Sequence, residues 1–126
     1  YIVTTIKDIS RMYHSSIPEK IKICEKNGGK VYLLTEITDE RLASFASRFE
    51  ATQTKVGQLR SRGRIIVEKG KKMIMSDAVL GGTQVNMESD FAICTNSAEM
   101  VNNIYALCSI LWETASDLKV PTLQVA

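Results

Sequence analysis

The residues best suited to chemistry lie in one basic segment, residues 60–77, with the sequence RSRGRIIVEKGKKMIMSD. Seven of the sixteen Lys and Arg residues fall between Lys55 and Lys72, and Glu68 is the single acid in that interval. Side chains of this kind hold anions by charge and polyols by hydrogen bonds. A solvated basic hairpin that binds no ligand is the other interpretation of the same pattern.

Within the segment, the spacing is R-x-R-x-x-x-x-K-G from Arg62, and a serine follows a short apolar run. The residues of this pattern are Arg62, Arg64, Lys69 and Ser76. Arginine stays protonated near neutral pH, so it cannot act as the nucleophile that forms a covalent phospho-enzyme. We assign no catalytic residue and do not expect an enzyme.

Other kinds of chemistry find little support in the sequence. His14 is the single histidine, and no cysteine or acid pair stands near it at metal-ligand spacing. The glycine pairs at 28–29 and 81–82 match neither a dinucleotide-binding motif nor a P-loop. We therefore predict neither a metal nor a cofactor.

The elements that must position the basic segment alternate between strands and helices. Residues 1–6 are rich in β-branched side chains and residues 31–35 are mostly apolar, as is typical of buried strands. A short helical turn capped by Asp8 follows the first strand, then a helix that begins at a Ser16–Glu19 capping box. A further helix is expected from residue 38 to Phe49. This order predicts parallel strands joined by helices.

The second half of the chain continues with a weaker strand at 54–59, the hairpin at 60–77 and a surface loop at 78–88. Residues 90–95 are expected to form another interior strand. A long helix capped by Asn96 should run to about Lys119. The fold class is therefore α/β: a mixed, mainly parallel sheet with helices on both faces and a β-hairpin.

The last helix has an apolar stripe wider than one sheet face requires. Its stripe comprises Val101, Ile104, Cys108, Leu111, Ala115 and Leu118, with Tyr105, Leu107, Ile110 and Trp112 beside it. One interpretation is that the helix also packs on a partner subunit; the other is that its own sheet covers it entirely. The sequence leaves both open.

Length and composition bound the remaining possibilities. A chain of 126 residues suits one domain, and a net charge of +2 does not require a nucleic-acid or membrane partner. No apolar run approaches the roughly 20 residues that span a bilayer. The three cysteines have no C-x-x-C spacing, so we expect buried thiols in a reducing cytoplasm. Because the chain begins inside a strand at Tyr1, we expect it to be part of a longer protein.

The hairpin spacing resembles the phospholipase D superfamily motif, in which His-x-Lys-x-x-x-x-Asp leads through a Gly turn to a Gly-Ser-x-Asn corner. Arg62, Arg64 and Lys69 stand at the positions of that His, Lys and Asp, and Ser76 is retained in the corner. The corner's Gly and Asn are replaced by other residues. The resemblance thus implies a catalytically inactive copy of the site that keeps three cations. Its candidate ligand-binding residues are Arg62, Arg64, Lys69 and Ser76.

Residues 90–101, DFAICTNSAEMV, and the pair Leu111-Trp112 resemble the last strand and helix of a known regulatory domain. It is the C-terminal phospholipase-D-like domain of archaeal TrmB-type transcription regulators, and the opening Val3-Thr4-Thr5 strand and the hairpin are similar to it as well. The resemblance spans residues 1–118 and leaves 119–126 as a tail. It implies an effector-sensing and dimerisation domain.

The resemblance further implies a homodimer and a small anionic or sugar-like effector. DNA would be contacted only through an N-terminal winged helix-turn-helix outside this sequence. Two alternatives remain: a phosphodiesterase or nuclease of the phospholipase D type, and direct nucleic-acid binding by the basic hairpin. The first lacks the His-x-Lys pair. The second lacks interleaved aromatic residues in a chain that is 6% aromatic.

Overall fold

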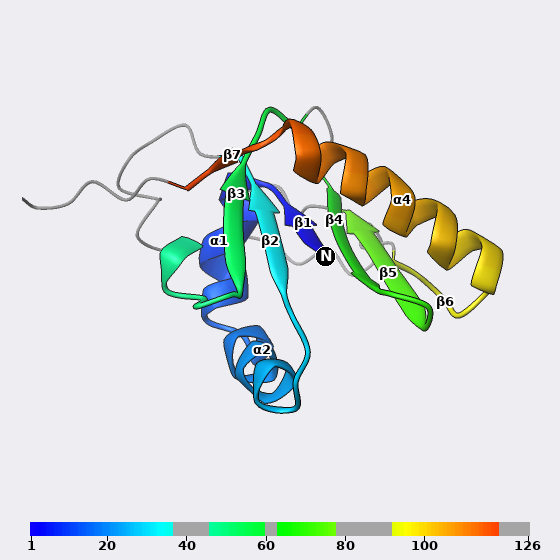
Figure 1. Ribbon diagram of the computed structural model, residues 1–126. Helices are drawn as coiled ribbons and strands as arrows, with labels where there is room; N and C mark the ends of the chain where they lie inside the picture. Colours follow the sequence, from blue (N-terminus) through cyan, green and yellow to red (C-terminus); the bar gives the residue numbers. More distant parts are fainter. Residues whose placement is uncertain (37–45, 60–62, 78–91, 119–126) are drawn as a thin grey trace, which may run out of the picture.

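A computed structural model of the chain describes residues 1–36, 46–59, 63–77 and 92–118 (Figure 1). These residues form an α/β structure with one mixed sheet and three helices. The strands are β1 (Ile2–Thr4), β2 (Tyr32–Thr35), β3 (Gln53–Val56), β4 (Gly63–Glu68), β5 (Lys72–Asp77), β6 (Ala92–Thr95) and β7 (Ser116–Asp117). The helices are α1 (Ile6–Tyr13), α2 (Ile17–Lys26) and α4 (Ala98–Thr114).

The described sheet has seven strands in the order β6-β5-β4-β1-β2-β3-β7. The first three strands pair in parallel, as the alternation of strands and helices predicts. The prediction of a mainly parallel sheet is wrong, because four of the six described pairings are antiparallel. The reason is the basic hairpin: β4 runs back beside β1, and a tight connection between β4 and β5 permits only antiparallel pairing.

The predicted hairpin is confirmed, with β4 and β5 in register from Gly63↔Asp77 to Glu68↔Lys72. Gly70 closes its turn with φ +71, a left-handed conformation that costs a residue with a Cβ more than it costs glycine. The Lys71 amide donates to the Glu68 carbonyl oxygen at 3.0 Å across the same turn.

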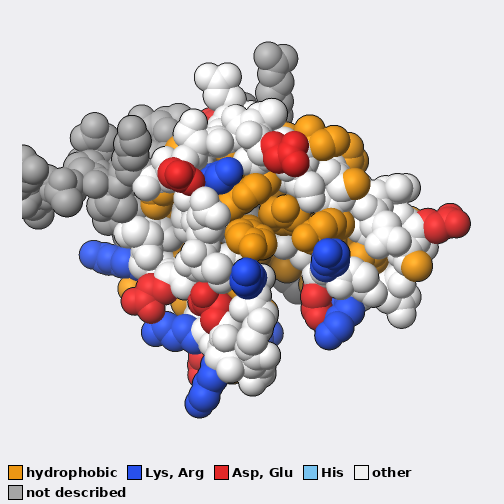
Figure 2. Space-filling model, in the orientation of Figure 1, with side chains coloured by type: hydrophobic (Ala, Val, Ile, Leu, Met, Phe, Trp, Pro, Cys, Tyr) orange, Lys and Arg blue, Asp and Glu red, His pale blue; other side chains and the backbone are white. Residues whose placement is uncertain are grey.

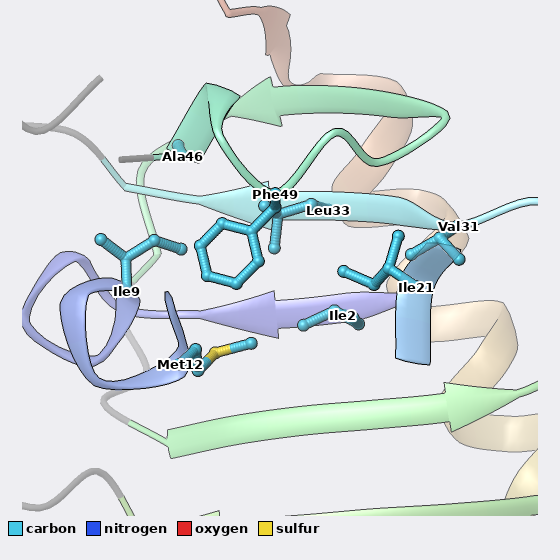
Figure 3. Packing of buried hydrophobic residues seen from close by; sticks show 8 residues of the cluster. All are labelled: Ile2, Ile9, Met12, Ile21, Val31, Leu33, Ala46 and Phe49. Carbon is cyan, nitrogen blue, oxygen red and sulfur yellow. The ribbon is translucent and has the colours of Figure 1, made fainter. Parts of the chain in front are cut away.

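Two buried clusters lie beside the sheet, and neighbouring residues of one strand belong to different clusters. Ile2 and Leu33 lie in a cluster with Ile9 of α1 and Ile21 of α2 (Figure 3). The next residues along β1 and β2, Val3 and Leu34, lie in the cluster that contains Val101 and Cys108 of α4. This division follows from the pleat, which turns successive side chains to opposite sides of a strand.

Three sequence predictions about element ends and environment need correction. Residues 92–95 form a strand, but β6 lies at the end of the described sheet, and Ile93 is exposed rather than interior. Ser97, not Asn96, stands at the N-cap of α4. The helix ends at Thr114, short of Lys119, because the following residues pair with β3 as β7. A short apolar run in the sequence indicates a strand but does not indicate which strands lie beside it in the sheet.

The cysteine prediction is also wrong in part. Cys108 is buried, whereas Cys24 and Cys94 are exposed, and all three are free thiols. No helix within the described ranges is long and apolar enough to cross a membrane. The predicted helix start at 38, the loop at 78–88 and the tail at 119–126 lie outside the described residues.

Helix α2 provides a matched test of the packing. Ile21 is 3% exposed and lies in the buried cluster, whereas Ile23, on the same helix, is 53% exposed. We expect Ile21→Ala to lower the free energy of unfolding by about 2–4 kcal/mol, because it removes buried methyl groups and leaves a cavity. Ile23→Ala should change it by no more than about 0.5 kcal/mol. Urea denaturation of both variants measures the difference, and equal losses would contradict the placement of α2.

Candidate functional site

A buried carboxylate on α1 is the centre of the polar contacts in the described sheet. Asp8 is 4% exposed. Arg64 of β4 binds it through two hydrogen bonds, from Nε to Oδ2 at 2.6 Å and from Nη2 to Oδ1 at 2.6 Å. The Thr4 hydroxyl donates to the same Oδ2 at 2.5 Å. This two-pronged geometry matches the planar guanidinium fork to the carboxylate and accounts for the burial of the charge.

The structure places Asp8 in the first turn of α1, not at its cap. The helix begins at Ile6, so the predicted role of Asp8 as N-cap is wrong. Its carboxylate instead points to the sheet, as do the neighbouring Ile9 and Met12, which are fully buried. Burial alone would raise the pKa of Asp8. Hydrogen bonds from Arg64 and Thr4, together with the charges of Arg64 and Arg11, outweigh it and hold the pKa below its ordinary value.

Arg64 and its partners form a row across four neighbouring strands. Thr35 of β2 lies beside Thr4 of β1, and Arg64 of β4 lies opposite Ser76 of β5. Because β1 and β4 are antiparallel with Val3 opposite Ile65, the next position along the two strands sets Thr4 opposite Arg64. The row therefore lies on one side of the sheet, at the carboxyl ends of β1 and β2. Open α/β sheets bind their ligands at such ends.

The row holds one buried polar atom without a partner. Thr35 is fully buried, and its hydroxyl has no hydrogen-bond partner among the described residues. Buried hydroxyls in proteins are nearly always bonded, so an unpaired one marks a place suited to a further polar group. The adjacent Glu36 uses Oε2 to accept from the Leu59 amide at 3.1 Å, which ties the end of β2 to the chain before the hairpin.

The predicted ligand-binding residues separate into two places. Arg64 and Ser76 lie together at one end of the hairpin. Lys69 is at the other end, in the turn, five residues or about 17 Å along the strand from Arg64. Its Nζ lies 5.7 Å from the ring centroid of Tyr105 on α4. Arg62 is outside the described residues. No single small ligand spans both ends of the hairpin.

Sequence reasoning missed Asp8 and Thr4 as parts of this site. They lie 56 and 60 positions before Arg64, too far for any local spacing to connect them. One signal was present: Asp8 occupies a helix position between apolar residues that turned out to face the core. An acid at such a position needs a cation, and the basic hairpin was the main source of cations.

The geometry limits what this site can do. The Asp8–Arg64 pair is neutral as a unit, so it attracts a phosphate less than a free arginine would. Arg64 is 27% exposed, and its contacts with Asp8 use two of its five N–H donors. The remaining donors and the Ser76 hydroxyl suit hydrogen bonds to a hydroxyl-rich ligand. No group of three or more potential metal ligands occurs in the part of the chain that the structure describes.

Comparison with known proteins adds no family assignment. No protein-family model matches the sequence, and no curated protein matches it significantly.

The buried pair predicts a large effect from loss of its cation. We expect Arg64→Met to lower the free energy of unfolding by about 2–4 kcal/mol, because it leaves the Asp8 carboxylate buried and unpaired. The double variant Arg64→Met, Asp8→Asn should recover part of the loss. Lys71→Met breaks an exposed ion pair with Glu68 on the same hairpin and should cost no more than about 1 kcal/mol. Urea denaturation tests all three; similar losses for Arg64 and Lys71 would argue against the pair.

The lowered pKa of Asp8 predicts a specific dependence of stability on acid. Because its folded-state pKa lies below the unfolded value of about 3.9, the ionised pair stabilises the fold fully above that value. This contribution disappears as the pH falls through the folded-state pKa. Asp8→Asn should therefore flatten the fall in unfolding free energy below about pH 4. Glu68→Gln, at an exposed pair, should retain it. Urea titrations from about pH 2 to pH 6 measure both slopes.

Proposed function

We propose that this chain is the effector-sensing and dimerisation domain of a TrmB-type transcription regulator, with a catalytically inactive phospholipase-D-like fold. Helices on both faces of the sheet belong to this proposal. They are supported by the division of Ile2 and Val3, and of Leu33 and Leu34, between the cluster of α1 and α2 and the cluster of α4. DNA would be bound through a winged helix-turn-helix that precedes this domain.

The observation that carries the proposal is an exposed apolar flank on α4. The flank comprises Met100, Leu107, Ile110 and Leu111, all of them exposed. Leu107 and Ile110 are 57% and 58% exposed, although each is as hydrophobic as a core residue. Large apolar side chains gathered on one side of a helix mark an interaction site more often than a free surface.

The arrangement of α4 explains why this flank suits a second copy of the chain. At about 100° per residue, its four members fall in a sector of about 100°, directly beside the buried Val101 and Cys108. The helix contains two acids, Glu99 and Glu113, and both fall outside this sector, about 20° and about 60° beyond Ile110. An uncharged apolar face can meet itself across a two-fold axis without repulsion. Of the two interpretations of the wide stripe, the exposure favours packing on a partner.

The site on the other side of the sheet supports sensing rather than catalysis. In the described part of the predicted site, Arg64 takes the position of the motif's lysine, and Asp8 neutralises it. An effector there would bind through the remaining Arg64 donors and the Ser76 hydroxyl. Such contacts favour a sugar-like effector over a strongly charged anion. An effector shifts the regulator only if it binds two arrangements of the dimer with different affinity.

Light scattering of the 126-residue chain tests dimerisation directly. We expect a dimer at micromolar concentration and a monomer for Leu107→Lys, because a buried lysine ammonium on the flank is costly to desolvate. Asn102→Lys places the same charge on the opposite, polar side of α4 and should leave the dimer intact. A monomeric parent chain, or equal dissociation by both variants, would count against the proposal. Circular dichroism confirms that each variant is folded.

A further inference from the structure

Four aromatic rings gather at the amino ends of β1 and β2, away from the Arg64 site. Tyr1 lies 5.6 Å from Tyr32, 5.0 Å from Tyr105 and 5.9 Å from Trp112, between ring centroids. Tyr32 and Trp112 are 5.2 Å apart. These four rings, here called the aromatic platform, come from the start of the chain, β2 and α4. Although the chain is poor in aromatic residues, half of its eight are in this one place.

The platform is only half-buried, so parts of the rings face solvent. Figure 2 shows hydrophobic side chains gathered in the middle of this face, in front of the first strand, with basic side chains around them. Tyr105 and Trp112 are seven residues apart on α4, which separates them by about 10 Å along the helix axis. The rings therefore form a row rather than a single stack.

A lysine stands at each end of this row. The Lys55 Nζ lies 4.8 Å from the Trp112 ring centroid and donates to the Trp112 carbonyl oxygen at 3.3 Å. The Lys69 Nζ lies over Tyr105 at the other end. Neither lysine forms an ion pair with a carboxylate in the described ranges. Two neighbouring acids are engaged elsewhere. Asp117, which pairs with Lys55 across β3 and β7, accepts from Gln53 at 2.9 Å, and Glu68, next to Lys69 in the chain, pairs with Lys71 at 3.2 Å.

We propose that the aromatic platform, with Lys55 and Lys69, binds a short single strand of nucleic acid. Exposed ring faces accept unpaired bases by stacking, and lysines beside them attract the phosphates. In a duplex the base faces are stacked on one another, so a duplex could bind only through the charge of the lysines. A mononucleotide could reach one lysine, whereas lysines at opposite ends of the row suit phosphates on different nucleotides of one strand. The proposal does not depend on dimerisation.

The single tryptophan provides a direct probe, because Trp112 is the only one in the chain. We expect oligo(dT) of eight nucleotides to quench its fluorescence, and anisotropy of a labelled strand to report the same affinity. Trp112→Ala should weaken binding about tenfold or more, since one stacking surface is lost.

The lysines are tested by salt dependence. Lys69→Ala should reduce the slope of log K against log salt by about 0.7, the value expected for one phosphate contact on a single strand. Lys71→Ala, in the same turn but paired with Glu68, should leave that slope unchanged. Lys69 is exposed in the turn, so its variant tests the proposal even where Trp112→Ala does not fold.

Three results would overturn the proposal. One is the lack of Trp112 quenching by oligo(dT) up to millimolar concentration. Another is equal affinity for thymidine monophosphate or for duplex DNA of the same length. A third is equal loss from Lys69→Ala and Lys71→Ala, which would indicate nonspecific attraction to the hairpin. The dimerisation proposal is judged separately, by light scattering of the parent chain, and Leu107→Lys should still bind the strand.

Discussion

The buried carboxylate of Asp8 is the constraint on which the arrangement of α1, β1 and β4 depends. An unpaired carboxylate at that depth costs several kcal/mol, so the fold must bring a cation to it. Arg64 meets this requirement only if β4 lies beside β1 in its observed register. A slip of one residue would turn Arg64 to the other side of the sheet and leave Asp8 alone. The pair thus joins the parallel half of the sheet to the antiparallel hairpin.

The two sides of the sheet are stabilised in different ways. On the side of α1, a polar contact of defined geometry fixes the position of the helix. On the side of α4, Val101 and Cys108 bury apolar area against Val3, Val67 and Met73, and this packing is less directional. The helix can therefore carry more apolar surface than its own sheet covers. We attribute that excess, on Leu107 and Ile110, to a partner in the proposed dimer.

Much of the fold could be predicted because its signals are local. The hairpin follows from two apolar runs around Gly70, and the parallel unit follows from strands that alternate with helices. The position of β6 could not be predicted, since an apolar run such as Ala92–Thr95 has the same pattern at the edge of a sheet as at its centre. The helix end at Thr114 depends on the pairing of Ser116 and Asp117 with β3, which is a long-range contact.

The candidate site shows the same limit. The sequence analysis placed Arg64 and Ser76 in one candidate site, and the structure brings them together because the hairpin register sets them opposite each other. The same group included Lys69. In an extended strand, however, residues only five positions apart in sequence lie far apart in space. The partner of Arg64 could not be found from spacing, because Asp8 reaches it through tertiary packing.

The distribution of charge in the basic segment changes how its cations are interpreted. Arg64 is neutralised by Asp8, and Lys71 is paired with Glu68, so neither adds a free positive charge. Lys69 of this segment, like Lys55 of β3, instead lies against an aromatic ring on the α4 side. A segment that looks like one basic patch in the sequence therefore has two chemically different ends. A ligand at the Arg64 end and a strand on the aromatic platform would not compete for the same groups. Any coupling between them would require a change in β4 and β5 that both ligands bias.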